Sequence, residues 1–139
     1  MADDVLLNKI GIIERCLKRV EEEYHGHEQE LRENFTRQDS IILNLLRACE
    51  ASIDLAMHLV RSRKLGLPQE SREAFTLLER SGVLDGALAA RMRAMVGFRN
   101  VAVHNYQKMN LDIVKSILER HIDDFRRYAE VVLRLEGNT

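Results

Sequence analysis

The sequence is poor in the residues that bend, break or cross-link a chain. Its 139 residues include one proline, seven glycines and no tryptophan. This composition favours helix over sheet, and the length suits a single domain over residues 1–139 with a hydrophobic core of its own. The two cysteines, Cys16 and Cys49, fall on apolar helical stripes. They are therefore expected to be buried free thiols in a reducing cytosol, which argues against a disulfide framework.

Several patterns that would assign a function are also missing. No apolar run approaches the roughly 20 residues of a membrane span, and Asp3 and Asp4 stand where a secretory signal would carry positive charge. We therefore expect a cytoplasmic protein with no membrane partner. The sequence has no glycine-rich phosphate loop, and the Glu-x-x-His pattern of di-iron bundles occurs once, at Glu22 and His25. We expect neither a metal site nor a cofactor.

Apolar residues recur at helical spacing in four long stretches and one short stretch. The long stretches cover residues 3–24, 36–64, 85–104 and the segment from Asn110 onward, and the short one covers residues 70–80. Gly66-Leu67-Pro68 marks a turn, and Thr36 with Asp39 resembles a capping box at the start of the second helix. The predicted fold is all-α: an up-and-down bundle of four long helices with a short helix inserted.

The charges are distributed unevenly along the chain. A net charge of −1 argues against a strongly basic nucleic-acid binder, yet residues 86–111 contain no acid and carry +4, while the rest of the chain carries −5. The cations of this window are Arg91, Arg93, Arg99 and Lys108. A local positive potential would favour a phosphate-bearing ligand. Pairing of these cations with acids on neighbouring helices is an equally good interpretation.

One stretch of the window concentrates reactive side chains among apolar neighbours. Arg99-Asn100-Val101-Ala102-Val103-His104-Asn105-Tyr106 brings together a permanent cation, an imidazole and a phenol. At about 100° per residue, Asn100 and His104 share a helical face, whereas Arg99 and His104 are about 140° apart. One straight helix therefore cannot aim Arg99 and His104 at the same atom. Either the helix breaks or ends near His104, or a second copy of the chain completes the site.

The spacing Arg-x4-His-x-Tyr at positions 99, 104 and 106 resembles the motif of HEPN-domain ribonucleases. Two further segments, Gln-Asp-Ser-Ile-Ile-Leu-Asn-Leu at 38–45 and Leu-Gly-Leu-Pro at 65–68, resemble the HepT family within that group. HepT proteins are the toxins of bacterial HepT–MntA (type VII) toxin–antitoxin pairs. The resemblance covers nearly the whole chain, and the motif positions match without exception.

This resemblance implies a homodimeric HEPN bundle that cleaves RNA without a metal. It assigns Arg99 and His104 as the catalytic pair, because arginine can hold the scissile phosphate and histidine has an ordinary pKa suited to moving protons near neutrality. Asn100, Arg93 and Tyr106 are expected to support catalysis or contact RNA. In this family a nucleotidyltransferase antitoxin of the MntA type attaches AMP to the tyrosine of the motif, which is Tyr106 here.

A second function class remains open at this point. The chain could be a catalytically silent HEPN module that partners a nucleotidyltransferase, or binds its substrate, without cutting RNA. The intact Arg99, His104 and Tyr106 favour catalysis over this alternative.

Overall fold

A computed structural model of the chain describes residues 3–137 and is helical throughout. The helices are α1 (Asp4–Tyr24), α2 (Phe35–Ser62), α3 (Ser71–Arg80), α4 (Gly86–His104), α5 (Leu111–Ser116) and α6 (Ile122–Gly137). Short 3₁₀ turns occur at Glu28–Leu31 (η1) and Tyr106–Lys108 (η2), and a π-helical turn, Ile117–His121 (η3), separates α5 from α6. The predicted all-α bundle is confirmed.

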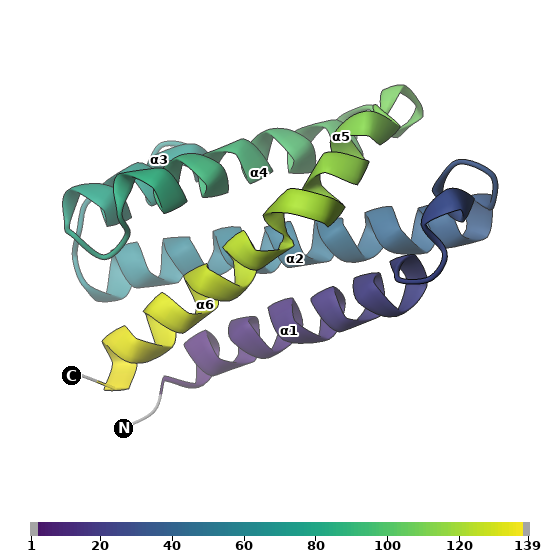
Figure 1. The fold of residues 1–139 in the computed structure, drawn as a ribbon. Coiled ribbons are helices and arrows are strands. Elements are labelled where there is room, and N and C mark those ends of the chain that lie inside the picture. Colours follow the sequence, from purple (N-terminus) through teal and green to yellow (C-terminus); the bar gives the residue numbers. More distant parts are fainter. Residues whose placement is uncertain (1–2, 138–139) are drawn as a thin grey trace.

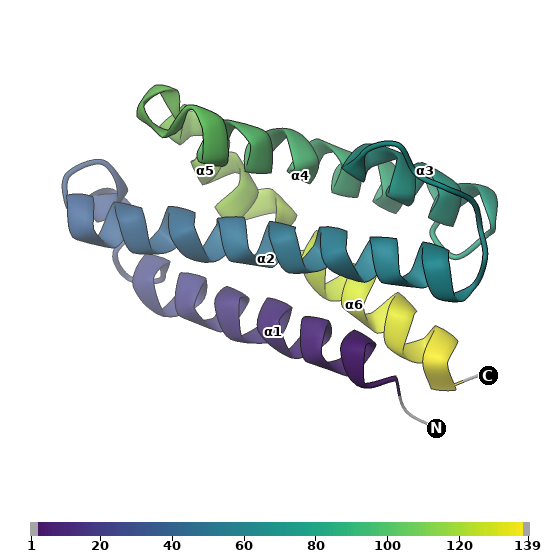
Figure 2. The ribbon, with the colours of Figure 1, turned by 180° about the vertical axis from the view of Figure 1, so that it is seen from behind.

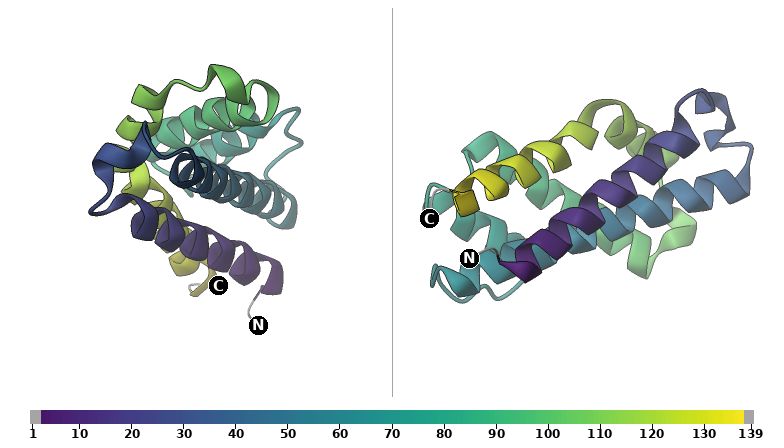
Figure 3. Two further views of the ribbon diagram at one scale, coloured as in Figure 1. Left: turned by 90° about the vertical axis from the view of Figure 1, so that its right-hand side faces the viewer. Right: turned by 90° about the horizontal axis from the view of Figure 1, so that it is seen from below.

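Helix α2 is the central element of the bundle. It runs antiparallel to α1 on one side and lies beside α3 and α4 on the other, while α6 crosses diagonally over the group (Figures 1 and 2). The beginning of α1 and the end of α6 lie at the same end of the bundle (Figure 3). There the Asp3 amide donates to a Glu136 carboxylate oxygen (3.0 Å). The opposite end holds η1, the start of α2, η2 and α5 (Figure 1).

Aromatic packing joins three helices in the core. Tyr128 of α6 and Phe75 of α3 are fully buried and meet edge to face, with ring centroids 5.7 Å apart. The Tyr128 hydroxyl donates to the Ser52 carbonyl oxygen of α2 (2.8 Å), which satisfies its buried polar group. The scaffold around α4 is therefore densely packed, and it can hold surface side chains of that helix in fixed positions.

Two details of the predicted helices are wrong. Asn34, and not Thr36, caps α2: its side chain accepts from the Arg37 amide (3.1 Å), so the helix begins at Phe35. The last long helix is not continuous, because η3 interrupts it. Both Ile117 and Ile122 are buried, although residues five apart lie about 140° apart on an α-helix. The wider π turn lets both side chains face the core.

Candidate active site on helix α4

Helix α4 carries most of the motif residues, and its ends are well defined. Asp85 caps its start by accepting from the Leu88 amide (2.7 Å), and its last residue is His104. The Asn105 amide still donates to the Val101 carbonyl (2.8 Å), but the Asn105 backbone has already left the helical region. The helix is thus regular from Arg99 to His104 and ends directly after the histidine.

Arg99 is held by neutral partners. Its Nε donates to the Asn100 side-chain oxygen (3.0 Å), and its Nη2 donates to the Ser71 hydroxyl at the start of α3 (3.1 Å). Within residues 3–137 it makes no ion pair, so no carboxylate contacts its guanidinium directly. The Asn100 side chain, which the motif places on the face of His104, instead orients the guanidinium.

Arg99 lines a shallow hollow of about 250 Å³ between α3 and α4. The residues around this hollow come from the start of α3 and the middle of α4: Glu70, Ser71, Arg72, Val96, Arg99 and Asn100. Two guanidinium groups and the amino end of α3 create a positive environment there, which Glu70 offsets in part. Such a hollow suits a phosphate group, since arginine donors can bind two phosphate oxygens at once.

Arg72, like Ser71 and Glu70, lies at this hollow although the sequence motif did not indicate it. Its Nε donates to the Arg93 carbonyl (3.4 Å), so its side chain lies across α4. A Cβ on Gly97 would stand 3.1 Å from an Arg72 guanidinium nitrogen, and Gly97 therefore permits this close approach. Glycine inside a helix costs about 1 kcal/mol relative to alanine, so its presence in α4 was the available signal.

The four cations of the acid-free window form two groups, those with an acidic partner and those without one. Arg93 bonds Glu79 (2.9 Å) and lies within 3.4 Å of the Thr76 hydroxyl, and Arg91 lies 3.6 Å from the buried carboxylate of Asp124. In the described part of the chain, neither Arg99 nor Lys108 has an acidic partner. Pairing with acids on neighbouring helices is therefore confirmed for Arg91 and Arg93, and the charges without an acidic partner lie toward and just beyond the end of α4.

His104 is exposed at the last position of α4. Its side chain makes no hydrogen bond or ion pair with any described residue, and it is not among the residues that line the Arg99 hollow. The regular helix keeps Arg99 and His104 about 140° apart around its axis. One copy of the chain therefore presents the two motif residues on different sides of α4.

Tyr106 lies beyond the helix, in η2, and reaches back to α2. Its hydroxyl donates to a carboxylate oxygen of Asp39 (2.5 Å), a residue 67 positions away in the sequence. The residue is 40% exposed, so Tyr106 is partly accessible from outside the bundle. Partial burial, followed by the hydrogen bond and charge of Asp39, raises the pKa of the Tyr106 hydroxyl well above its usual range. The phenol is therefore neutral near pH 7.

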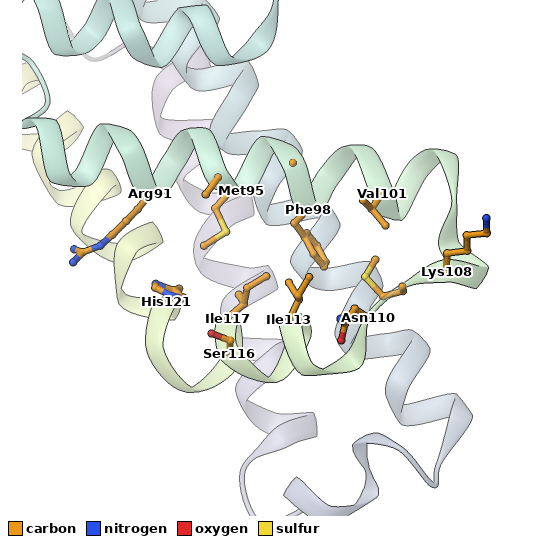
Figure 4. A pocket seen from close by; sticks show the side chains of 13 residues that line it. Arg91, Met95, Phe98, Val101, Lys108, Asn110, Ile113, Ser116, Ile117 and His121 are labelled. Carbon is orange, nitrogen blue, oxygen red and sulfur yellow. The ribbon is translucent and has the colours of Figure 1, made fainter.

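A larger cavity of about 480 Å³ lies on another side of α4, against α5 and η3 (Figure 4). Met95, Phe98 and Val101 point from α4 toward Ile113 and Ile117, with Arg91 and His121 at one end of the cavity (Figure 4). None of the motif residues lines this cavity. It is therefore separate from the arrangement of Arg99, His104 and Tyr106.

Other candidate nucleophiles and ligands do not form a competing site. Cys16 and Cys49 are buried free thiols as predicted, and burial raises the pKa of both. Neither is therefore an activated thiolate. Over residues 3–137, no three His, Cys, Asp or Glu side chains lie close enough together to hold a metal ion.

Comparison with known proteins identifies the family of the chain. The family model described as "Ribonuclease HepT-like" matches residues 13–132. The chain belongs to the HepT-like ribonuclease family. Membership confirms the resemblance carried by positions 99–106, and it makes the chain a ribonuclease by class.

Individual HepT relatives match along nearly their whole length. The mRNA nuclease HepT of Shewanella oneidensis is 45% identical over 130 residues, which is 94% of this chain and 97% of the relative. A solved structure of a tri-AMPylated HEPN toxin from the same organism, in complex with an MNT antitoxin, is 44% identical with a TM-score of 0.90, covering 96% of this chain and 99% of that one. A toxin–antitoxin structure with AMP-PNP has the same identity and TM-score, covering 95% and 99%.

The remaining prediction that bears on this HepT-like chain concerns membranes. Within the part that the structure describes, none of the helices combines the length and apolar character needed for a membrane crossing.

Proposed function

We propose that this HepT-like chain is the toxin of a toxin–antitoxin pair. It cleaves RNA without a metal, in a homodimeric site built from Arg99 and His104, and a nucleotidyltransferase antitoxin switches it off by attaching AMP to Tyr106. The observation that carries the catalytic part is the Arg99 guanidinium, which neutral groups hold beside an open hollow and which forms no ion pair within the described residues. The relatives are an mRNA nuclease and an AMPylated toxin bound to its antitoxin, which supports the rest.

The two residues supply complementary chemistry for phosphodiester cleavage. Arg99 holds the scissile phosphate and stabilises the charge that develops on its oxygens. His104 accepts the proton of a ribose 2′-hydroxyl as that oxygen attacks phosphorus. A second imidazole then donates a proton to the leaving 5′-oxygen. The site thus requires two histidines with opposite tasks.

A homodimer supplies this second imidazole. The regular helix between Arg99 and His104 prevents one copy from directing both residues at one phosphate. In a two-fold dimer the same patches of both copies face each other, so a single cleft can receive both α4 ends. The shared cleft therefore accounts for the separation of Arg99 and His104 within one chain.

Mixing native chains with His104→Ala chains tests the shared cleft. If both imidazoles are needed, only dimers with two native chains are active, and an equal mixture keeps about a quarter of the fully native activity by random pairing. Chains that act alone would keep about half under the same random assembly. Initial cleavage rates at constant total protein, across several mixing ratios, distinguish a quadratic from a linear dependence. A linear dependence would contradict a cleft that needs both imidazoles.

Tyr106→Phe tests the switch. With the cognate nucleotidyltransferase and ATP, the native chain gains AMP at Tyr106 and loses RNA cleavage, because a bulky phosphodiester then carries negative charge into a phosphate-binding region. Tyr106→Phe is expected to cleave RNA equally with and without the antitoxin reaction. Peptide mass spectrometry locates the AMP, and Tyr24→Phe, which alters a buried tyrosine, serves as the control that remains switchable. AMP uptake by Tyr106→Phe at the native level would contradict the assignment.

A further inference from the structure

The Asp39 side chain does not take part in capping α2, although its spacing from Thr36 resembles a capping box. Asn34 caps α2, and Asp39 lies one turn further along the helix with an exposed side chain. Among residues 3–137, the only hydrogen bond of its side chain is the one it accepts from the Tyr106 hydroxyl at 2.5 Å. The carboxylate thus contacts the oxygen that would receive AMP.

The hydroxyl of Tyr106 needs a proton acceptor in order to react. A phenol has an ordinary pKa of about 10, and near neutral pH it is almost entirely protonated. Partial burial and the neighbouring carboxylate raise the pKa of Tyr106 further, so preformed tyrosinate is scarcer still. Attack on phosphorus must therefore proceed with transfer of the proton to a base within hydrogen-bond reach. Asp39 already occupies that position.

We propose that Asp39 is the general base that accepts the Tyr106 proton during AMP attachment. The inference rests on the proposed switch at Tyr106. In this step the Tyr106 Oη attacks the α-phosphorus of ATP, and the new Oη–P bond forms as the bond between the α-phosphorus and the pyrophosphate oxygen breaks. The phenolic proton passes to the Asp39 carboxylate and from there to solvent. Pyrophosphate leaves, and no oxidant or reductant takes part.

The surroundings hold this pair together before any partner arrives. Arg32, just after η1, forms an ion pair with Asp112 of α5, so the segments that carry Asp39 and Tyr106 are joined by a second contact nearby. Asp39 and Tyr106 are both exposed, so the hydroxyl and the carboxylate stay open to an incoming nucleotide. The hydroxyl and its base are thus preorganised on the outside of the bundle.

Two substitutions at position 39 distinguish a proton acceptor from a residue that only positions Tyr106 through a hydrogen bond. Asp39→Asn keeps a side-chain oxygen that can accept the Tyr106 hydrogen bond, but it cannot take up the proton. Asp39→Ala removes both capabilities. We expect both variants to lower the single-turnover rate of AMP transfer by about 100-fold or more, the contribution of a positioned general base. The rate is measured with saturating nucleotidyltransferase and ATP, by following the mass of the intact chain.

Glu33→Gln is the matched control. It removes an exposed carboxylate between η1 and α2 without touching Tyr106, so its transfer rate is expected to equal the native rate. Thermal unfolding curves of all variants show that each one folds. A loss seen with Asp39→Ala alone, while Asp39→Asn transfers AMP at the native rate, would show that Asp39 only positions the loop and would overturn the inference.

The outcomes for the two proposals differ. Native chain that acquires AMP on Tyr106, with slow transfer in both Asp39 variants, supports the switch and the base together. Native rates in Asp39→Asn overturn the base but leave the switch intact. Native chain that acquires no AMP on Tyr106 overturns the switch itself and the base with it.

Discussion

His104→Ala is expected to lower kcat for RNA cleavage by about 10²- to 10⁴-fold, which is the usual contribution of a positioned proton-transfer group. His104 is exposed at the end of α4, and it bonds no other described residue, so both ring nitrogens are open to a ribose hydroxyl or a leaving oxygen. The same exposure means that truncation leaves no cavity. Activity should therefore fall while the midpoint of thermal unfolding stays at the native value.

His25→Ala is the matched control for this experiment. His25 is also exposed, and it directly follows α1, far along the chain from the motif. It should cleave a labelled RNA at the native rate. If His104→Ala cleaved as fast as the native chain, the catalytic assignment would be wrong, and a silent binding module would be the better interpretation of the motif.

Much of the fold could be predicted because its signals are local. Apolar residues at helical spacing locate α1, α2 and α4, and the glycine that ends α3, Gly82, has the positive φ (83°) that suits this residue. Asn110 caps α5 as its residue type suggests, by accepting from the Asp112 amide (2.8 Å). Each of these features depends on a few neighbouring residues. The sequence therefore contains enough information to place them.

The start of α2 and the break in the last helix depend on geometry that residue types alone leave open. Both Asn34 and Thr36 can cap a helix, and the outcome depends on which side chain reaches a free amide in the folded chain. Likewise, Ile117 and Ile122 fit a helical stripe only if the turn between them widens. Packing against the rest of the bundle decides both cases.

The candidate site likewise contains residues that the sequence predicts and residues that only the folded structure brings to it. The motif identified Arg99, Asn100, His104 and Tyr106. The helical angle of about 100° per residue also predicted that a regular helix holds Arg99 and His104 on different sides, as α4 does. The residues that hold this set come from elsewhere: Ser71 lies 28 positions from Arg99, and Asp39 lies 67 from Tyr106. Only the packing of α2 and α3 against the end of α4 brings them together. Gly97 was the one local sign of such an approach.

The geometry of Arg99 implies that charge alone is insufficient at this position. Two of its donors are committed to the Asn100 and Ser71 oxygens, which fixes the plane of the guanidinium. The remaining donors of its planar fork are then available to phosphate oxygens beside the hollow. A lysine ammonium is a compact charge on a flexible stem, so it cannot make both anchoring bonds and still present a fork to phosphate.

Arg99→Lys is therefore expected to lower kcat/KM for RNA cleavage by about 10²- to 10³-fold, comparable to the loss of one preorganised donor to a developing oxyanion. Arg80→Lys, at the exposed end of α3, makes the same chemical change away from the hollow and should leave cleavage at the native rate. Steady-state cleavage of one labelled RNA at fixed ionic strength gives the comparison, because salt screens both cations. Native activity in Arg99→Lys would mean that Arg99 acts only as a diffuse positive charge. A loss of activity at position 99 without a loss at position 80 would show that cleavage needs the planar guanidinium that Asn100 and Ser71 hold in place.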